Sequence, residues 1–138
     1  MERTEKNDKV VADNNCPDTI ALSTLPKTWI FDLDGTVVKH NGYKTDNQDT
    51  LLDGAKEYID NIPPEDFILI LTSRTDEYRD MTLEFLEHNG IRYNEIIFNM
   101  PMGERILVND RKPSGVEMAV AMNLDRDKFV LPDIERVL

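Results

Sequence analysis

The sequence has one cysteine, no long apolar run and few basic residues, and each shortage excludes a class of protein. The single cysteine, Cys16, allows no disulfide within the chain, which fits a reducing compartment. The longest apolar runs have about five residues, far short of the roughly 20 that a membrane-spanning helix needs. Residues 1–9 hold no apolar segment of a secretory signal, so we expect a cytoplasmic protein without a membrane partner.

Acidic residues outnumber basic ones by 27 to 16, which gives a formal net charge of −11. Charge of this sign repels polyanions at long range, so we expect no nucleic-acid partner. It also opposes an anionic phosphate ester, and a site for one would need cations placed locally. The length of 138 residues suits one domain, and the 40% of apolar residues can form its core.

Residues 1–26 are polar and contain two prolines, which predicts a leader that is loosely ordered or docked on the body. Within it, residues 10–12 and 20–22 are candidates for a short edge strand. Residues 27–138 are expected to form the folded domain, and they alternate strand and helix patterns. Short apolar runs predict strands over 28–33, 67–72, 95–99, 105–110 and 128–131. Helical spacing and capping residues predict helices over 51–61, from Thr75 toward Gly90 and over 114–123. Turn formers predict a hairpin or flap over 37–49.

Strands that alternate with helices across short loops predict an α/β fold, a single Rossmann-like domain with a parallel sheet flanked by helices. Sheets of this kind bind ligands at the carboxyl ends of their strands. Polar side chains follow three of the predicted strands: Asp32 and Asp34; Thr72, Ser73 and Arg74; Asn109, Asp110, Arg111 and Lys112. We therefore expect a polar site at one edge of the sheet.

Asp32 and Asp34 are two residues apart at a strand end, so their side chains point the same way. Joined by Asp110, they would repel strongly unless a cation bound them, and hard cations such as Mg²⁺ prefer oxygen ligands. The sequence therefore predicts a magnesium site formed by these three carboxylates. There Asp32 could attack a phosphate monoester, while Asp34 protonates the leaving oxygen and later deprotonates water.

Other residues are candidates for binding the phosphate. Gly35 permits a tight turn close to the substrate, and the Thr72 hydroxyl could donate a hydrogen bond to it. Thr36, Ser73, Arg74 and Arg111 complete the predicted substrate-binding residues. Simpler roles stay open: a strand-to-helix cap for Thr72 and Ser73, a helix N-cap for Asp110, and surface charges for Arg74, Arg111 and Lys112.

Three segments resemble motifs of the haloacid dehalogenase superfamily. FDLDGTVV (31–38) resembles its first motif, LILTSR (69–74) its second, and ILVNDRKPSG (106–115) its acidic fourth. The resemblance implies a Rossmann-like, haloacid-dehalogenase-like fold that covers about residues 28–131. Aspartate at position 34 resembles the phosphatases and phosphotransferases of the superfamily.

The resemblance also implies roles for individual residues. It makes Asp32 the nucleophile and Asp34 the acid/base, which would bind Mg²⁺ through its backbone carbonyl. Asp110 would be the third protein ligand, and Thr72 would bind phosphate.

The chain departs from the superfamily in two respects. The third motif is a lysine or arginine before the fourth strand, and 99–106 has no lysine. Arg105 and Lys112 are the candidates, and Lys112 is slightly favoured because it follows a strand end. Only 35 residues separate Asp34 from Ile70, so no large cap domain fits there. The open site would take large substrates or be closed by a second subunit of a homo-oligomer.

These observations predict a magnesium-dependent phosphatase of a small-molecule phosphate ester. The run 103–115 also resembles small capless members encoded among bacterial capsule and lipopolysaccharide genes, which implies a sugar or polyol phosphate of surface polysaccharide biosynthesis. One alternative is a phosphatase acting on a macromolecule. Another is a catalytically weak phosphate-binding or regulatory module, which the missing third-motif lysine favours.

Overall fold

Three parallel strands form the main sheet of the protein, whose computed structural model describes residues 19–137. β2 (Thr28–Asp32) and β4 (Glu95–Ile97) flank the central strand β3 (Phe67–Leu71), in the order β2-β3-β4. Asp32 lies beside Leu71, so β2 and β3 end at the same edge. Each strand is an apolar run that was predicted from the sequence, although β4 ends at Ile97, before Asn99, whose φ is 63°.

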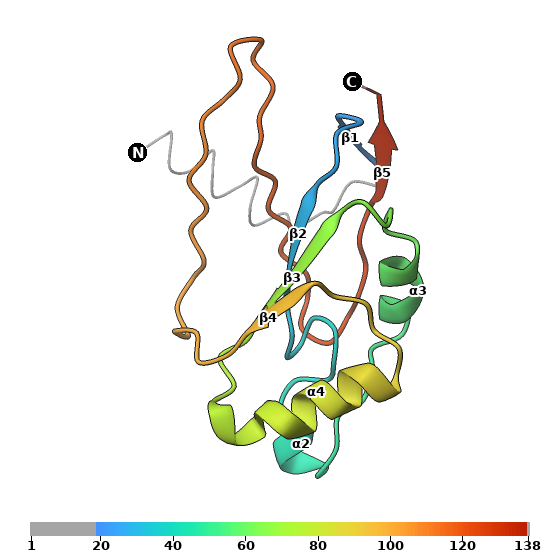
Figure 1. Ribbon diagram of the computed structural model, residues 1–138, viewed down its shortest axis with the longest axis vertical. Coiled ribbons are helices and arrows are strands. Elements are labelled where there is room, and N and C mark those ends of the chain that lie inside the picture. Colours follow the sequence, from blue (N-terminus) through green and yellow to red (C-terminus); the bar gives the residue numbers. More distant parts are fainter. Residues whose placement is uncertain (1–18, 138) are drawn as a thin grey trace.

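A second, two-stranded parallel sheet pairs β1 (Thr19–Leu22) with β5 (Asp133–Arg136). The edge strand predicted at 20–22 is therefore confirmed, and this part of the leader is docked on the body (Figure 1). The prediction of a strand at 128–131 is wrong. Phe129 and Leu131 pack against the hydrophobic core instead, and the strand follows them. The other leader strand, at 10–12, and Cys16 lie outside the described residues.

The helices are α2 (Gly42–Thr45), α3 (Ala55–Asp60) and α4 (Arg79–His88), with a 3₁₀ turn, η1 (Asp76–Tyr78), leading into α4. The first replaces the predicted hairpin or flap at 37–49: the chain forms a one-turn helix there, followed by Asn47 with a φ of 61°. α3 is shorter than the predicted 51–61, and α4 lies where a helix was expected. Within residues 19–137 no helix is long and apolar enough to cross a membrane.

One face of the main sheet packs into the core. Phe31, Ile68 and Ile70 are buried on this face, and Ile59 of α3 and Leu86 of α4 belong to the same hydrophobic cluster. Figure 1 shows these two helices to the right of and below the sheet. The protein is thus α/β, with small parallel sheets flanked by helices in an arrangement compatible with one small domain.

The opposite face of the main sheet, which we call the open face, is largely exposed in the described part of the chain. Alternation along the strands places Ile30, Phe67 and Ile97 on it, with exposed fractions of 48%, 45% and 40%. Parallel sheets usually have both faces covered. Asp32 shares this face, because it follows Ile30 by two residues.

Residues 101–124 form an extended, exposed segment that we call the arm (Figure 1). Its two legs meet near a turn at Lys112, where the Gly115 N–H donates to the Lys112 carbonyl at 2.7 Å and Arg111 pairs with Glu117. The predicted strand at 105–110 joins no sheet of the described chain, and the helix predicted at 114–123 is absent from it; both predictions are wrong for this structure. A short amphipathic helix is stable only when its apolar face packs on something, and the arm packs on little.

Candidate active site

A tight turn at the end of β2 presents the two candidate catalytic carboxylates. Gly35 has a φ of 86°, which favours glycine, and its N–H donates to the Val38 carbonyl at 2.7 Å. Buried Leu33 and Val38 anchor the turn. The Asp32 side chain is 42% exposed and the Asp34 side chain 18% exposed, so Asp32 is the more accessible of the two.

A buried arginine holds Asp34. The Arg74 side chain is 1% exposed, and its Nε and Nη2 donate to the two carboxylate oxygens of Asp34 at 3.0 and 2.8 Å. Nη1 and Nη2 donate to Asp49 at 3.0 and 2.7 Å, and Nη1 also donates to Thr82 Oγ1 at 2.8 Å. The ring of Tyr43 lies 3.9 Å from the guanidinium carbon, a cation–π contact. All five N–H donors of Arg74 are therefore used within the protein.

This arrangement keeps Arg74 charged. Burial opposes the charged form, but the hydrogen bonds and negative charges of Asp34 and Asp49 outweigh it, so the pKa of Arg74 lies above its ordinary value. The sequence left two roles open for Arg74, a substrate contact or a surface charge, and its burial contradicts the surface charge. Arg74 instead fixes the orientation of the Asp34 carboxylate.

Asp32 contacts one cation and one hydroxyl. Arg105 Nη1 donates to Asp32 Oδ1 at 3.0 Å, and Thr36 Oγ1 donates to Asp32 Oδ2 at 3.3 Å. Arg105 comes from the base of the arm, whereas Lys112 lies at its tip. Of the two candidates for the third motif, the structure brings Arg105 to Asp32.

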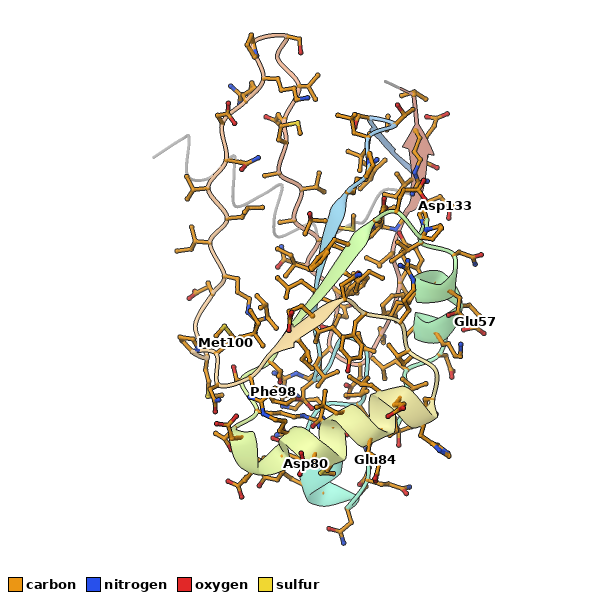
Figure 2. The ribbon with its side chains drawn as sticks, in the orientation of Figure 1. Glu57, Asp80, Glu84, Phe98, Met100 and Asp133 are labelled. Carbon is orange, nitrogen blue, oxygen red and sulfur yellow. The ribbon has the colours of Figure 1, made fainter. Side chains whose placement is uncertain are left out.

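The loop after β3 joins the site to the base of the arm. Thr72 is buried, and its Oγ1 accepts the backbone N–H of Arg74 at 3.1 Å, which stabilises the turn. Ser73 Oγ donates to the Pro101 carbonyl at 3.3 Å, and the Met100 N–H donates to the Thr72 carbonyl at 3.0 Å. Figure 2 shows Met100 where the arm leaves the sheet. Thr72 and Ser73 thus hold the backbone of this loop, but neither caps the following helical turn η1, whose N-cap residue is Thr75.

The structure does not bring Asp110 or Arg111 to this edge. Both are exposed near the tip of the arm, where Arg111 forms an ion pair with Glu117 at 3.1 Å. Among residues 19–137, no group of three or more acidic, histidine or cysteine side chains could hold a metal ion. Because Asp110 lies near the tip of the arm, the donors present in one chain do not fit the predicted three-carboxylate magnesium site.

Several residues of this region were not predicted to belong to it. The contacts that Tyr43, Asp49 and Thr82 make in common with Arg74 depend on tertiary packing. The chain after the arm also reaches the turn. The Asp127 N–H donates to the Gly35 carbonyl at 2.8 Å, and the Asp127 carboxylate accepts the His40 N–H at 2.7 Å.

The chain matches no protein-family model, no curated protein and no solved structure in comparisons with all three.

Proposed function

We propose that this protein is a phosphohydrolase that attacks a phosphate monoester with Asp32. The observation that carries the proposal is the half-exposed Asp32 carboxylate at the carboxyl end of β2, in contact with Arg105 and two residues before an oriented Asp34. The proposal is supported because these two carboxylates and a cation lie at the edge of the sheet where α/β proteins bind ligands.

The contacts support a division of roles. Arg105 is partly exposed, so its guanidinium can turn from Asp32 to the phosphoryl oxygens and offset their charge. The Asp32 carboxylate then forms a bond to phosphorus as the bond to the leaving oxygen breaks, which gives an aspartyl-phosphate. Asp34 would give a proton to the leaving oxygen and take one from the water that hydrolyses this intermediate.

Mg²⁺ is part of the proposed mechanism only if a third carboxylate reaches Asp32 and Asp34.

We also propose that the substrate is a small sugar or polyol phosphate, which the protein hydrolyses in the cytoplasm for surface polysaccharide biosynthesis. This part of the proposal is based on the resemblance of residues 103–115 to small capless phosphatases.

One observation favours a second candidate, a catalytically weak phosphate-binding module. Both carboxylate oxygens of Asp34 accept hydrogen bonds from Arg74, which competes with transfer of protons by Asp34. Such a module would bind phosphate beside Arg105 without turning over an ester.

Phosphate release from a panel of monoesters, with and without Mg²⁺, tests these candidates. We expect Asp32→Asn to abolish turnover with an unchanged melting temperature, and Asp80→Asn, an exposed change on α4 (Figure 2), to leave turnover intact. Arg105→Ala should lower turnover about 10- to 100-fold, the value of a charged hydrogen bond, and Arg105→Lys should restore part of it. Turnover that survives in Asp32→Asn would refute the proposal, and phosphate binding without any turnover by the wild type would favour the module.

A further inference from the structure

The arm exposes apolar side chains that a folded protein usually covers. Ile106 is 86% and Val108 84% exposed, and Met102, Leu107, Met118 and Val120 are also exposed. An isolated pair of extended segments that packs on no hydrophobic core is only marginally stable in water. Its unpaired backbone N–H and C=O groups can form hydrogen bonds with a strand of another chain. The arm carries three acidic and three basic residues, so its formal net charge is zero, whereas that of the whole chain is −11. A second copy of the chain would therefore not repel the arm electrostatically.

The main sheet has a free edge and an uncovered face that would accept a strand like the arm. β2 is an outer strand, and its described backbone contacts run to β3 on one side only. The open face next to this edge carries Ile30 on β2, Phe67 on the central strand β3 and, at the far side of the sheet, Ile97 on β4. A strand added to the edge of β2 would pair its backbone, and the chain that follows could cover the face.

The segment 106–110 matches β2 in length and in its last residue. Both have five residues, and both end in an aspartate. If 106–110 pairs in parallel with β2 so that Asp110 lies beside Asp32, then Val108 lies beside Ile30. Alternation then places Val108 on the open face with Ile30, and Asp110 on the same face as Asp32.

The direction of the arm favours a second copy over the chain's own sheet. In Figure 1 the first leg rises from the carboxyl end of β4 toward the end of the molecule where β2 begins, so it runs opposite to β2 of the same chain. Its base is held by hydrogen bonds from Ser73, Asn99 and Met100 that join it to the loop after β3. A copy related by a two-fold axis perpendicular to the strands presents its β2 in the reverse direction, which is parallel to this leg.

We propose that two copies of the chain exchange arms, each adding residues 106–110 as a parallel strand beside β2 of the other. Asp110 of each arm then joins Asp32 and Asp34 of the other copy and completes the cluster of three carboxylates that one chain lacks. The role given to Asp110 rests on the proposed function, whereas the exchange itself rests on the arm, the free edge and the open face.

A disulfide tests the exchange without any assay of activity. In a Cys16→Ser background, the double variant Ile30→Cys with Val108→Cys should give a covalent dimer on a non-reducing gel. The pair Val137→Cys with Val108→Cys, which joins an exposed residue beyond β5, should not. A disulfide within one chain, or none at all, would overturn the exchange. Since cysteine variants can fail to fold, the wild-type mass in solution is a second measurement: light scattering should give a dimer, and a monomer at micromolar concentration would overturn it.

Complementation tests the role of Asp110. Asp32→Asn and Asp110→Asn should each be inactive, but co-expression should restore about one quarter of the wild-type activity, because half of the dimers would be mixed and one of their two sites intact. A covalent dimer without complementation would overturn the role of Asp110 in the partner's site and leave the exchange standing. A wild type without phosphatase activity would refute the proposed function, and the disulfide would still decide on the exchange.

Discussion

Replacing Asp49 by asparagine removes one of the two carboxylates that hold the buried Arg74. The Asp49 side chain is 2% exposed, and both of its oxygens accept hydrogen bonds from the guanidinium, at 2.7 and 3.0 Å. Asparagine has nearly the same shape but no charge, and its amide group would face a donor of Arg74. The change therefore tests the ion pair with little change in packing volume.

We expect Asp49→Asn to lower the free energy of unfolding substantially, although the two side chains have nearly the same shape. Removing one partner of a buried ion pair costs about 3–5 kcal/mol, because the other charge stays buried without compensation. Asp34 still pairs with Arg74, which places the expected loss near the lower limit, about 3 kcal/mol. The free energy of unfolding of native proteins is about 5–15 kcal/mol, so the variant should remain folded in water.

Urea denaturation measures the effect. With an m-value of about 1–3 kcal/mol/M, the midpoint of Asp49→Asn should fall by about 1–3 M. Asp60→Asn is the control: it breaks an exposed pair with Lys56 on α3, for which about 0.3–0.5 kcal/mol is expected. A midpoint for Asp49→Asn no lower than that of the control would refute the reasoning on the buried pair.

Three further changes test other contacts. Gly35→Ala should cost about 1–2 kcal/mol in chemical denaturation, because its φ of 86° is unfavourable for any residue with a Cβ; an unchanged midpoint would contradict this strain. Asp66→Asn should cost about 1–3 kcal/mol, since one acceptor is lost where the carboxylate accepts the Trp29 indole N–H and a backbone N–H; an unchanged melting temperature would contradict it. The hydrogen bond from Arg79 lowers the pKa of Asp76, so its stabilisation is present above the unfolded pKa and is lost as the pH falls through the folded pKa. Asp76→Asn should therefore flatten the acid limb of stability against pH, and a limb identical to that of the wild type would show that this pair contributes nothing.

Strands β2 and β3 were predicted to within one residue because their evidence is local. The continuous apolar run 67–71 has the composition of a strand buried in a parallel sheet, and Gly35 follows the first strand in a turn that few other residues adopt. The order of the three strands was not predicted, and the structure shows that successive strands lie side by side, as is common in parallel sheets.

Local sequence patterns did not predict the structure of the arm. The residues of 105–110 have the composition of a strand, and they are extended, but which edge accepts them is a long-range choice. The helix predicted at 114–123 failed for the same reason, because its apolar residues find no surface in the described chain on which to pack.

The sequence by itself determined that a strand ends beside Asp32 and Asp34, because an apolar run followed by a turn-forming glycine acts locally. Tertiary structure alone decided what surrounds them. Arg74 pairs with carboxylates 40 and 25 residues away, and Arg105 rather than Lys112 reaches Asp32. Such contacts depend on how distant segments pack, and no local pattern of residues encodes them.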